Sequence, residues 1–524
     1  MSGSGQDGMK KSVMPAPQTQ RPPEADSLQD HSPEKLRRRV VRGGSLTLAV
    51  RLAVQLVTWP VLFLVLRVLS PADYGLFVTA GLFASLASIL AVAGLDRALV
   101  QKKRVTHADM AASFTLSLFL SAGLYFMLWA LSAPVAKYLE APDLGSLLRF
   151  IALILFLVPV KIIGVATLKR QLRFGAECMI QAVATLFQAG VLLVLAYQGY
   201  GVWALALSFV CGHIMETSLL WYASGCRLAV TKPSADNFAL LRYGLIITAS
   251  SLVWYLFESA DYAVISAMLG QVTLGYYALA SLIVKAPREK MSVSINHIMF
   301  VTFCTLQDNP QRMRSWFIRL FVLQLLIACP ALIGLALVAD DAVPLILGEK
   351  WQSAVLPIQL LAPAGVLLIV SSSFAPFFNA IGRADINLKY DGACAASLIV
   401  AFVIGSHFFG LVGVCLVWLT LYPLLLAVMI RVTSSLTTIT LTDLTRATAP
   451  VLLGTVFMGI VVAGIGYFLP EAAPRSLRLA AMIAGGVLSY SIWMLAFARE
   501  MILADILVLA GELGWRRSAA PQAA

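Results

Sequence analysis

The sequence predicts an all-α protein that crosses a membrane many times, and two observations lead to that fold class. Apolar residues make up 59% of the 524 residues and charged residues only 13%, whereas soluble domains average about 45–50% and about 25%. The apolar residues also form runs of about 17–28 residues, the length of helix that spans a bilayer. This composition excludes a soluble enzyme, a secreted disulfide-rich domain and a disordered chain.

The runs predict about fourteen transmembrane helices separated by short polar breaks. The first run is too long for the apolar core of a signal peptide and has no small-residue cleavage pattern after it, so it is predicted as a membrane helix. The predicted helices lie near residues 45–69, 75–95, 111–131, 147–166, 177–197, 201–223, 241–268, 272–302, 317–338, 353–378, 392–408, 411–431, 447–469 and 479–498.

The distribution of cations predicts the orientation. With both termini in the cytoplasm, most of the 39 lysines and arginines fall in cytoplasmic segments, as the positive-inside rule requires. This pattern accounts for the net charge of +12 without nucleic acid. The periplasmic cations are Arg67, Lys137, Arg149, Lys350, Arg475 and Arg478, and those inside helices are Arg51, Lys161, Lys285, Arg288 and Lys290.

Neither the cysteines nor the histidines form a recognisable site. The seven cysteines and five histidines are dispersed, with no CxxC motif and no spacing typical of zinc ligands. We interpret the cysteines as small buried residues and predict no metal site, no cofactor and no catalytic residue.

A short internal repeat relates the two halves of the chain. Arg42-Gly43-Gly44 recurs as Arg242-Tyr243-Gly244, and the segment 69–77 (LSPADYGLF) recurs as 269–277 (LGQVTLGYY). The copies are separated by six predicted helices, so they have the same orientation in the membrane. Parallel repeats of this kind occur in transporters whose two lobes rock around a central site.

Four motifs follow one another in the first half: 69–77 (LSPADYGLF), 94–101 (GLDRALVQ), 168–174 (LKRQLRF) and 199–205 (GYGVWAL). In this order they resemble the polysaccharide-transporter branch of the multidrug/oligosaccharidyl-lipid/polysaccharide (MOP) exporter superfamily, which includes colanic-acid-exporter-like proteins. The second half matches more loosely, through Asp261, Leu269-Gly270, Gly275-Tyr276-Tyr277 and Pro287, and the resemblance covers roughly residues 42–430.

The resemblance implies a MATE-like fold of two parallel six-helix lobes plus two C-terminal helices. It also implies a flippase of the bacterial inner membrane that moves a polyprenyl-pyrophosphate-linked oligosaccharide to the periplasmic leaflet by alternating access, with a polymerase or glycosyltransferase as a partner. The expected segments are a disordered cytoplasmic tail 1–44, an N-lobe 45–235, a C-lobe 236–431, two helices within 432–498 and a cytoplasmic tail 499–524.

The cations inside the eighth predicted helix are the leading candidates for a substrate cavity, because charged side chains at membrane depth are costly and usually functional. Lys285 and Arg288 lie about one turn apart on either side of Pro287, which removes a helix hydrogen bond. Arginine binds phosphate bidentately and lysine binds it as a point charge. Alternatively, Lys285 and Glu289 form a neutral pair within the helix.

Two further cations could line the same cavity. Lys161 lies near the middle of its predicted helix, close after Pro159, where it cannot readily reach the membrane surface. Arg51 lies one to two turns into the first helix, so it either lines the cavity or extends to the interface.

Three carboxylates lie at similar depth, Glu216 on the sixth predicted helix and Glu258 and Asp261 on the seventh. The i,i+3 spacing of Glu258 and Asp261 places them on nearly one face. Such a pair suits coupling to a proton or sodium gradient, whereas the alternative is that these carboxylates form structural ion pairs with the buried cations.

Two other functions stay open. A drug exporter of the same superfamily would favour an acidic and aromatic cavity, whereas this chain places cations in its helices. A membrane polymerase or glycosyltransferase needs large periplasmic loops, but the longest breaks, near 132–146 and 339–352, are short. The sequence therefore favours the flippase, a carrier and not an enzyme.

Overall fold

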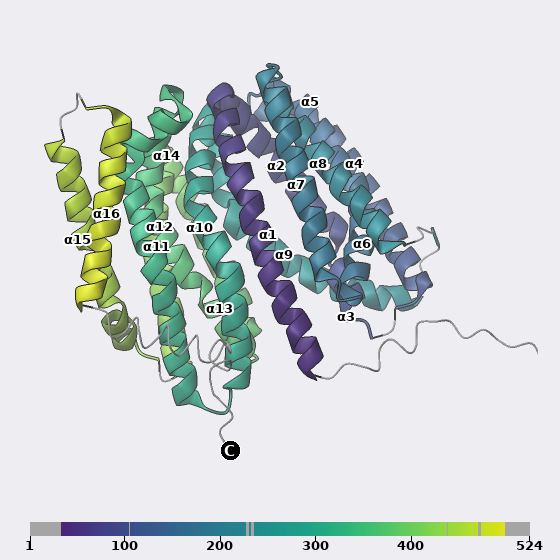
Figure 1. Ribbon diagram of the computed structural model, residues 1–524. Coiled ribbons are helices and arrows are strands. Elements are labelled where there is room, and N and C mark those ends of the chain that lie inside the picture. The colour runs from purple at the N-terminus through teal and green to yellow at the C-terminus, as the bar shows by residue number, and fades with distance from the viewer. Residues whose placement is uncertain are drawn as a thin grey trace, which may run out of the picture.

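The protein is described here from a computed structural model, which describes residues 33–103, 105–226, 230–231, 235–437, 439–469 and 473–497. Within these ranges the side chains of residues 33–49, 235–241, 243, 289–295, 297–298 and 301 are not described. Every regular element in the described ranges is helical (Figure 1). The prediction of an all-helical membrane protein is confirmed.

The first half of the chain forms a group of helices that we call the N-lobe. Its elements are α1 (Pro33–Val68), α2 (Pro71–Val92), α3 (Leu95–Gln101), α4 (His107–Tyr138), α5 (Pro142–Ile151), η2 (Ala152–Leu157), α6 (Val158–Arg170), α7 (Phe174–Tyr197) and α8 (Val202–Ser224).

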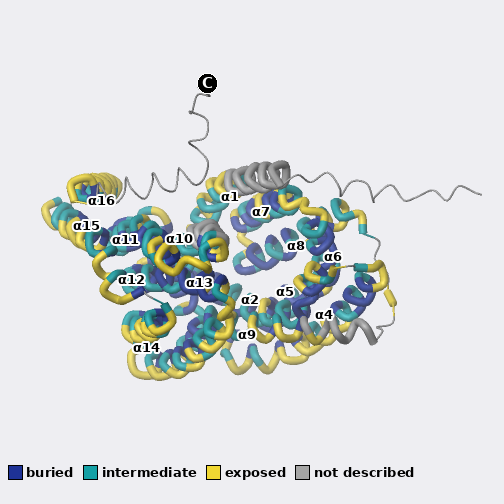
Figure 2. Tube along the Cα trace, turned by 90° about the horizontal axis from the view of Figure 1, so that it is seen from below, coloured by how far each residue is buried: buried dark blue, intermediate teal, exposed yellow. Residues whose placement is uncertain are grey.

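The second half forms the C-lobe and two further helices, which lie at the outer edge of the C-lobe (Figure 1). Seen from below, buried residues face the interior of each lobe and exposed residues cover the outside (Figure 2). The C-lobe consists of α9 (Ala235–Met268), α10 (Gly270–Thr305), α11 (Pro310–Leu347), η3 (Glu349–Ala354), α12 (Val355–Ser372), α13 (Phe374–Ala380) and α14 (Ala384–Leu436), followed by α15 (Leu441–Phe468) and α16 (Arg475–Phe497).

Eleven helices among the described residues are long and apolar enough to cross a membrane, so the predicted count of fourteen is not confirmed. The run Ala384–Leu436 counts once, although Gly410 interrupts it with φ 58° and ψ −138°. The helices α9 and α10, with 34 and 36 residues, are not among the eleven. Both carry several charged residues.

Several predicted boundaries differ from those observed. The first helix begins at Pro33 and not near residue 45, so part of the segment expected to be a disordered tail is helical. The breaks expected near 132–146 and 339–352 are largely helical, because α5 begins soon after α4 ends and only Gly348 separates α11 from η3. Residues 1–32 and 498–524, which include the ends of both expected tails, lie outside the described residues.

The two copies of the repeat pack against each other where α2 crosses α10. A methyl group at Gly75 would overlap the carbonyl oxygen of Gln271, and one at Gly275 would overlap the carbonyl oxygen of Pro71. Gln271 occupies the place in the second copy that Pro71 occupies in the first, so the contact is two-fold symmetric. Glycine lets the two backbones approach this closely.

Aromatic packing closes the same end of the interface between the lobes. Trp351 of η3 is completely buried, and its indole N–H donates to the carbonyl of Leu66 at 2.8 Å. The rings of Tyr74 and Tyr276 meet it edge-on, with centroids 6.2 Å and 6.1 Å away. Beside them, the Thr79 hydroxyl lies 3.0 Å from that of Ser266 on α9. We call these contacts, together with the Gly75–Gly275 crossing, the inter-lobe seam.

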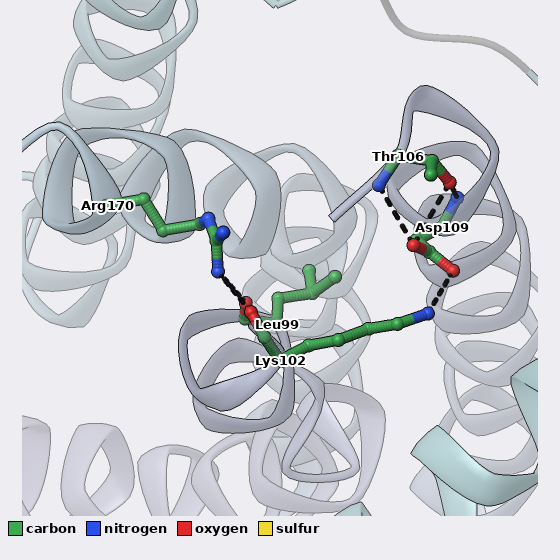
Figure 3. A network of polar contacts seen from close by, with 5 residues as sticks. All are labelled: Leu99, Lys102, Thr106, Asp109 and Arg170. Atoms are coloured by element: carbon green, nitrogen blue, oxygen red, sulfur yellow. Dashed lines mark hydrogen bonds and ion pairs between the residues drawn. The ribbon is translucent and has the colours of Figure 1, made fainter. Parts of the chain in front are cut away.

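Two of the sequence motifs meet near α3, at the opposite end of the N-lobe (Figure 1), and Figure 3 shows their contacts from close by. The guanidinium of Arg170 on α6 donates to the carbonyls of Leu99 and Lys102 at 3.1 Å and 2.6 Å, so it satisfies carbonyls that the end of α3 leaves free. Lys102 then pairs with Asp109 at 2.7 Å. Asp109 and Thr106 form the capping box that opens α4. These contacts fix α3 between α4 and α6.

We predict that Gly75→Ala destabilises the protein by roughly 1–3 kcal/mol, the usual cost of overpacking a close contact, because its methyl group meets the Gln271 carbonyl. Thermal unfolding of the purified protein measures the effect. Gly81→Ala on the same helix is the control, since its methyl group has no neighbour within 4 Å. Equal melting temperatures for the two variants would contradict the close packing of the seam.

Candidate functional site

A cavity of about 310 Å³ lies between α2 of the N-lobe and α9 and α10 of the C-lobe. Polar side chains on α9 and α10 reach it, among them Glu258 and Lys285. Three tyrosines also line it: Tyr74, Tyr255 and Tyr262. The Tyr255 hydroxyl donates to the carbonyl of Leu82 on α2 at 2.6 Å, which joins the two lobes across the cavity wall. The cavity therefore combines charge, hydroxyl groups and aromatic faces.

Asp261 is a completely buried carboxylate behind this cavity. It accepts a hydrogen bond of 2.6 Å from the Tyr277 hydroxyl on α10, and that hydroxyl accepts one of 3.0 Å from the Trp418 indole on α14. The backbone N–H of Tyr262 donates to its other oxygen at 2.9 Å. The chain of donors holds Asp261 in place and ties α9, α10 and α14 together.

Lys285 stands between Asp261 and the cavity. Its ammonium lies 3.8 Å from the Asp261 carboxylate, 3.3 Å from the carbonyl of Glu258 and 4.9 Å from the centre of the Tyr262 ring. An ammonium over an aromatic face is stabilised further by the ring quadrupole. Groups on α9 thus compensate the charge of Lys285, which also lines the cavity.

Arg288 pairs with Glu258, with Nη2 and Oε1 2.5 Å apart. Their side chains are 11% and 24% exposed, so solvent reaches the pair only partly. Glu258, Asp261, Lys285 and Arg288 form two adjacent ion pairs between α9 and α10 and carry no net charge together. We call these four residues the charge quartet.

The other predicted site residues lie elsewhere. Lys161 on α6 pairs with Glu216 on α8 at 2.7 Å, inside the N-lobe. Arg51 on α1 is exposed and makes no ion pair with the part of the chain that the structure describes. The side chain of Glu289 lies outside the described residues. The structure thus brings four of the eight candidates into one cluster and two into a separate pair.

Sequence reasoning assigned no role to two residues that hold Asp261 in place. Tyr277 and Trp418 lie far apart along the chain. Their only signal in the sequence is general: a buried tyrosine hydroxyl or tryptophan N–H needs a hydrogen-bond partner. Asp391 on α14 is half-buried and has no ion pair within the described residues, but it does not line this cavity. Among the described residues, no group of three His, Cys, Asp or Glu side chains could hold a metal ion.

Residues 64–356 match the family described as "Polysaccharide biosynthesis protein". The chain belongs to this family. Among curated proteins it is similar to the lipopolysaccharide biosynthesis protein WzxC of Escherichia coli (strain K12), with 27% identity over 360 residues, 67% of this chain and 72% of that protein. The family predicted from the sequence motifs is confirmed.

Solved structures show the fold. The lipid II flippase MurJ in an inward closed conformation aligns with a TM-score of 0.72 and 13% identity, covering 88% of this chain and all of that one. An inward-facing MATE multidrug transporter of the MOP superfamily aligns with a TM-score of 0.54 and 16% identity, covering 77% and 98%. The predicted MATE-like architecture is confirmed.

We predict that Lys285→Met destabilises the protein by about 3–5 kcal/mol, because it leaves a charge at Asp261 buried without its partner. The double variant Asp261→Asn/Lys285→Met removes both charges and recovers most of that loss. Chemical unfolding in detergent measures both. Lys389→Met, at a lysine that is 80% exposed, is the control. The prediction fails if the double variant is no more stable than Lys285→Met.

Proposed function

We propose that this chain is a flippase that moves polyprenyl-pyrophosphate-linked oligosaccharides from the cytoplasmic to the periplasmic leaflet, for the synthesis of a cell-surface polysaccharide. The observation that carries the proposal is the charge quartet at a cavity between two lobes, in a member of a polysaccharide biosynthesis family. The similarity to a lipopolysaccharide biosynthesis protein supports the class of substrate.

The ion pairs suggest how the cavity receives an anion. Lys285 and Arg288 are suitable donors for a pyrophosphate, but in this conformation Asp261 and Glu258 hold them. A bound pyrophosphate competes with those carboxylates, and the displaced carboxylates then need a proton or a sodium ion. The quartet would therefore couple substrate binding to an ion gradient.

The aromatic lining suits the sugar part of the substrate. Tyr74, Tyr255 and Tyr262 line the cavity with aromatic surface, against which sugar rings would pack. We propose a carrier, which holds the sugar in this cavity without transferring it. A polymerase or glycosyltransferase would act on its substrate before or after translocation.

We propose that residues 45–235 and 236–431 act as the two moving lobes and that 432–498 form an accessory helix pair. If both termini lie on the cytoplasmic side of a bacterial inner membrane, the inter-lobe seam lies at the periplasmic end. The described conformation then has its periplasmic end closed. Alternating access requires the seam to open while the opposite end of the lobes closes.

The decisive experiment determines in which leaflet the lipid-linked oligosaccharide accumulates when the gene is deleted. Intact spheroplasts are treated with a membrane-impermeant reagent that labels sugars, and the wild-type gene on a plasmid is the control. We expect the repeat unit to accumulate intact and unlabelled, because it is trapped on the cytoplasmic face. Labelled repeat units would indicate a later step, such as polymerisation, and no accumulation would favour a small-molecule exporter. Either result would contradict the proposal.

A further inference from the structure

Exposed aromatic side chains line one face of α4, and a lysine, Lys137, lies on this face near the C-terminal end of the helix. Phe126 and Trp129 are 64% and 51% exposed, and Lys137 lies about two turns beyond Trp129, about 12 Å by helical rise. The spacing 126, 129, 133 and 137 keeps these positions on one side of the helix. The stripe leads to the end of the bundle where α1 ends and α2 begins.

Arg149 of α5 reaches across this stripe and is held there by two contacts. Its Nε donates to the Ser132 hydroxyl at 2.6 Å, and its guanidinium carbon lies 5.1 Å from the centre of the Trp129 ring. Ser132 is itself completely buried and donates to the carbonyl of Trp129 at 2.7 Å. Within the described residues, the two terminal amino groups of Arg149 have no acceptor.

A pocket of about 530 Å³ lies beside these groups, between the end of α4 and the start of α5. Lys137 and Arg149 supply donors to it, and Glu140 and Ser146 also line it. The Ser146 hydroxyl itself donates to the carbonyl of Asp143 at 2.9 Å. The pocket therefore carries an excess of one positive charge. A guanidinium with its Nε already occupied presents two parallel N–H donors, which fit a phosphate group.

Two other arginines at the same end of the bundle have acidic partners, and a third, Arg67, donates to the carbonyl of Leu345. Arg475 of α16 pairs with Glu349, and Arg478 pairs with Asp341 at 3.2 Å. Lys137 and Arg149, by contrast, make no ion pair with the described part of the chain. The protein thus leaves these two charges available next to a face that contacts lipid.

We propose that this pocket binds the phosphate of an anionic phospholipid in the leaflet at that end of the bundle. Lys137 and Arg149 contact the headgroup, and the acyl chains lie along Phe126 and Trp129. The continuity between the pocket and the lipid-facing stripe favours a membrane lipid over a soluble anion. This site is separate from the charge quartet and does not depend on the proposed transport function.

Native mass spectrometry of the purified full-length protein tests the site, with phosphatidylglycerol and phosphatidylcholine as the probes. We expect the wild type to retain phosphatidylglycerol preferentially. Each cation near a membrane surface contributes about 1 kcal/mol of attraction, so Arg149→Gln and Lys137→Gln should each lower that retention about fivefold. Lys350→Gln, which removes an exposed cation of the C-lobe, is the control and should change nothing.

Three results would overturn the proposal: equal retention of the two lipids by the wild type, unchanged retention in both pocket variants, or an equal loss in the Lys350→Gln control. Displacement of phosphatidylglycerol by millimolar inorganic phosphate would instead assign the pocket to soluble anions. Lys137 is exposed, so Lys137→Gln should fold normally and keeps the test decisive if Arg149→Gln does not.

Discussion

A charged side chain inside a membrane must find a partner of opposite charge, and this requirement determines how α9 and α10 pack. Lys285 and Arg288 find acidic partners on α9, namely Asp261 and Glu258. Because Asp261 is also hydrogen-bonded through Tyr277 to Trp418, the pairing extends to α14. Lys161 and Glu216 satisfy the same requirement inside the N-lobe.

The inter-lobe seam is the second constraint, and it acts on the backbone. Gly75 and Gly275 let α2 and α10 cross at a distance that no other residue permits, and Trp351 fills the space that remains. The inter-lobe seam and the charge quartet both include residues of α10, so a shift of this helix changes both. Such a shared element is a physical basis for coupling the contents of the cavity to the opening of the lobes.

Much of the fold could be predicted from hydropathy, because membrane helices must be long and apolar. The predicted runs fall in helical segments, but 147–166 is divided among α5, η2 and α6, and 392–408 and 411–431 both lie within α14. The start of α2 at Pro71 was predicted too late because the Ser70–Asp73 capping box, which begins the helix, is polar. The site could be predicted only as a set of buried charges. Spacing within one helix suggested Lys285 with Glu289, whose side chain lies outside the described residues. The partner that the structure describes for Lys285 is Asp261 on a neighbouring helix, which is one of the carboxylate–cation pairs that the sequence left open. The ion-pair partner of Lys285 depends on how the helices pack, and the spacing of residues along one helix does not reveal that packing.

The most direct test of transport by opening of the seam is a flipping assay in liposomes with the double variant Thr79→Cys/Ser266→Cys. The two hydroxyls are 3.0 Å apart on α2 and α9, so the thiols that replace them can form a disulfide between the lobes. A fluorescent polyprenyl-pyrophosphate-linked oligosaccharide and an impermeant quencher report translocation, and each single cysteine variant is a control. The account predicts that oxidation stops flipping and reduction restores it. Flipping at the wild-type rate with the disulfide formed would contradict it.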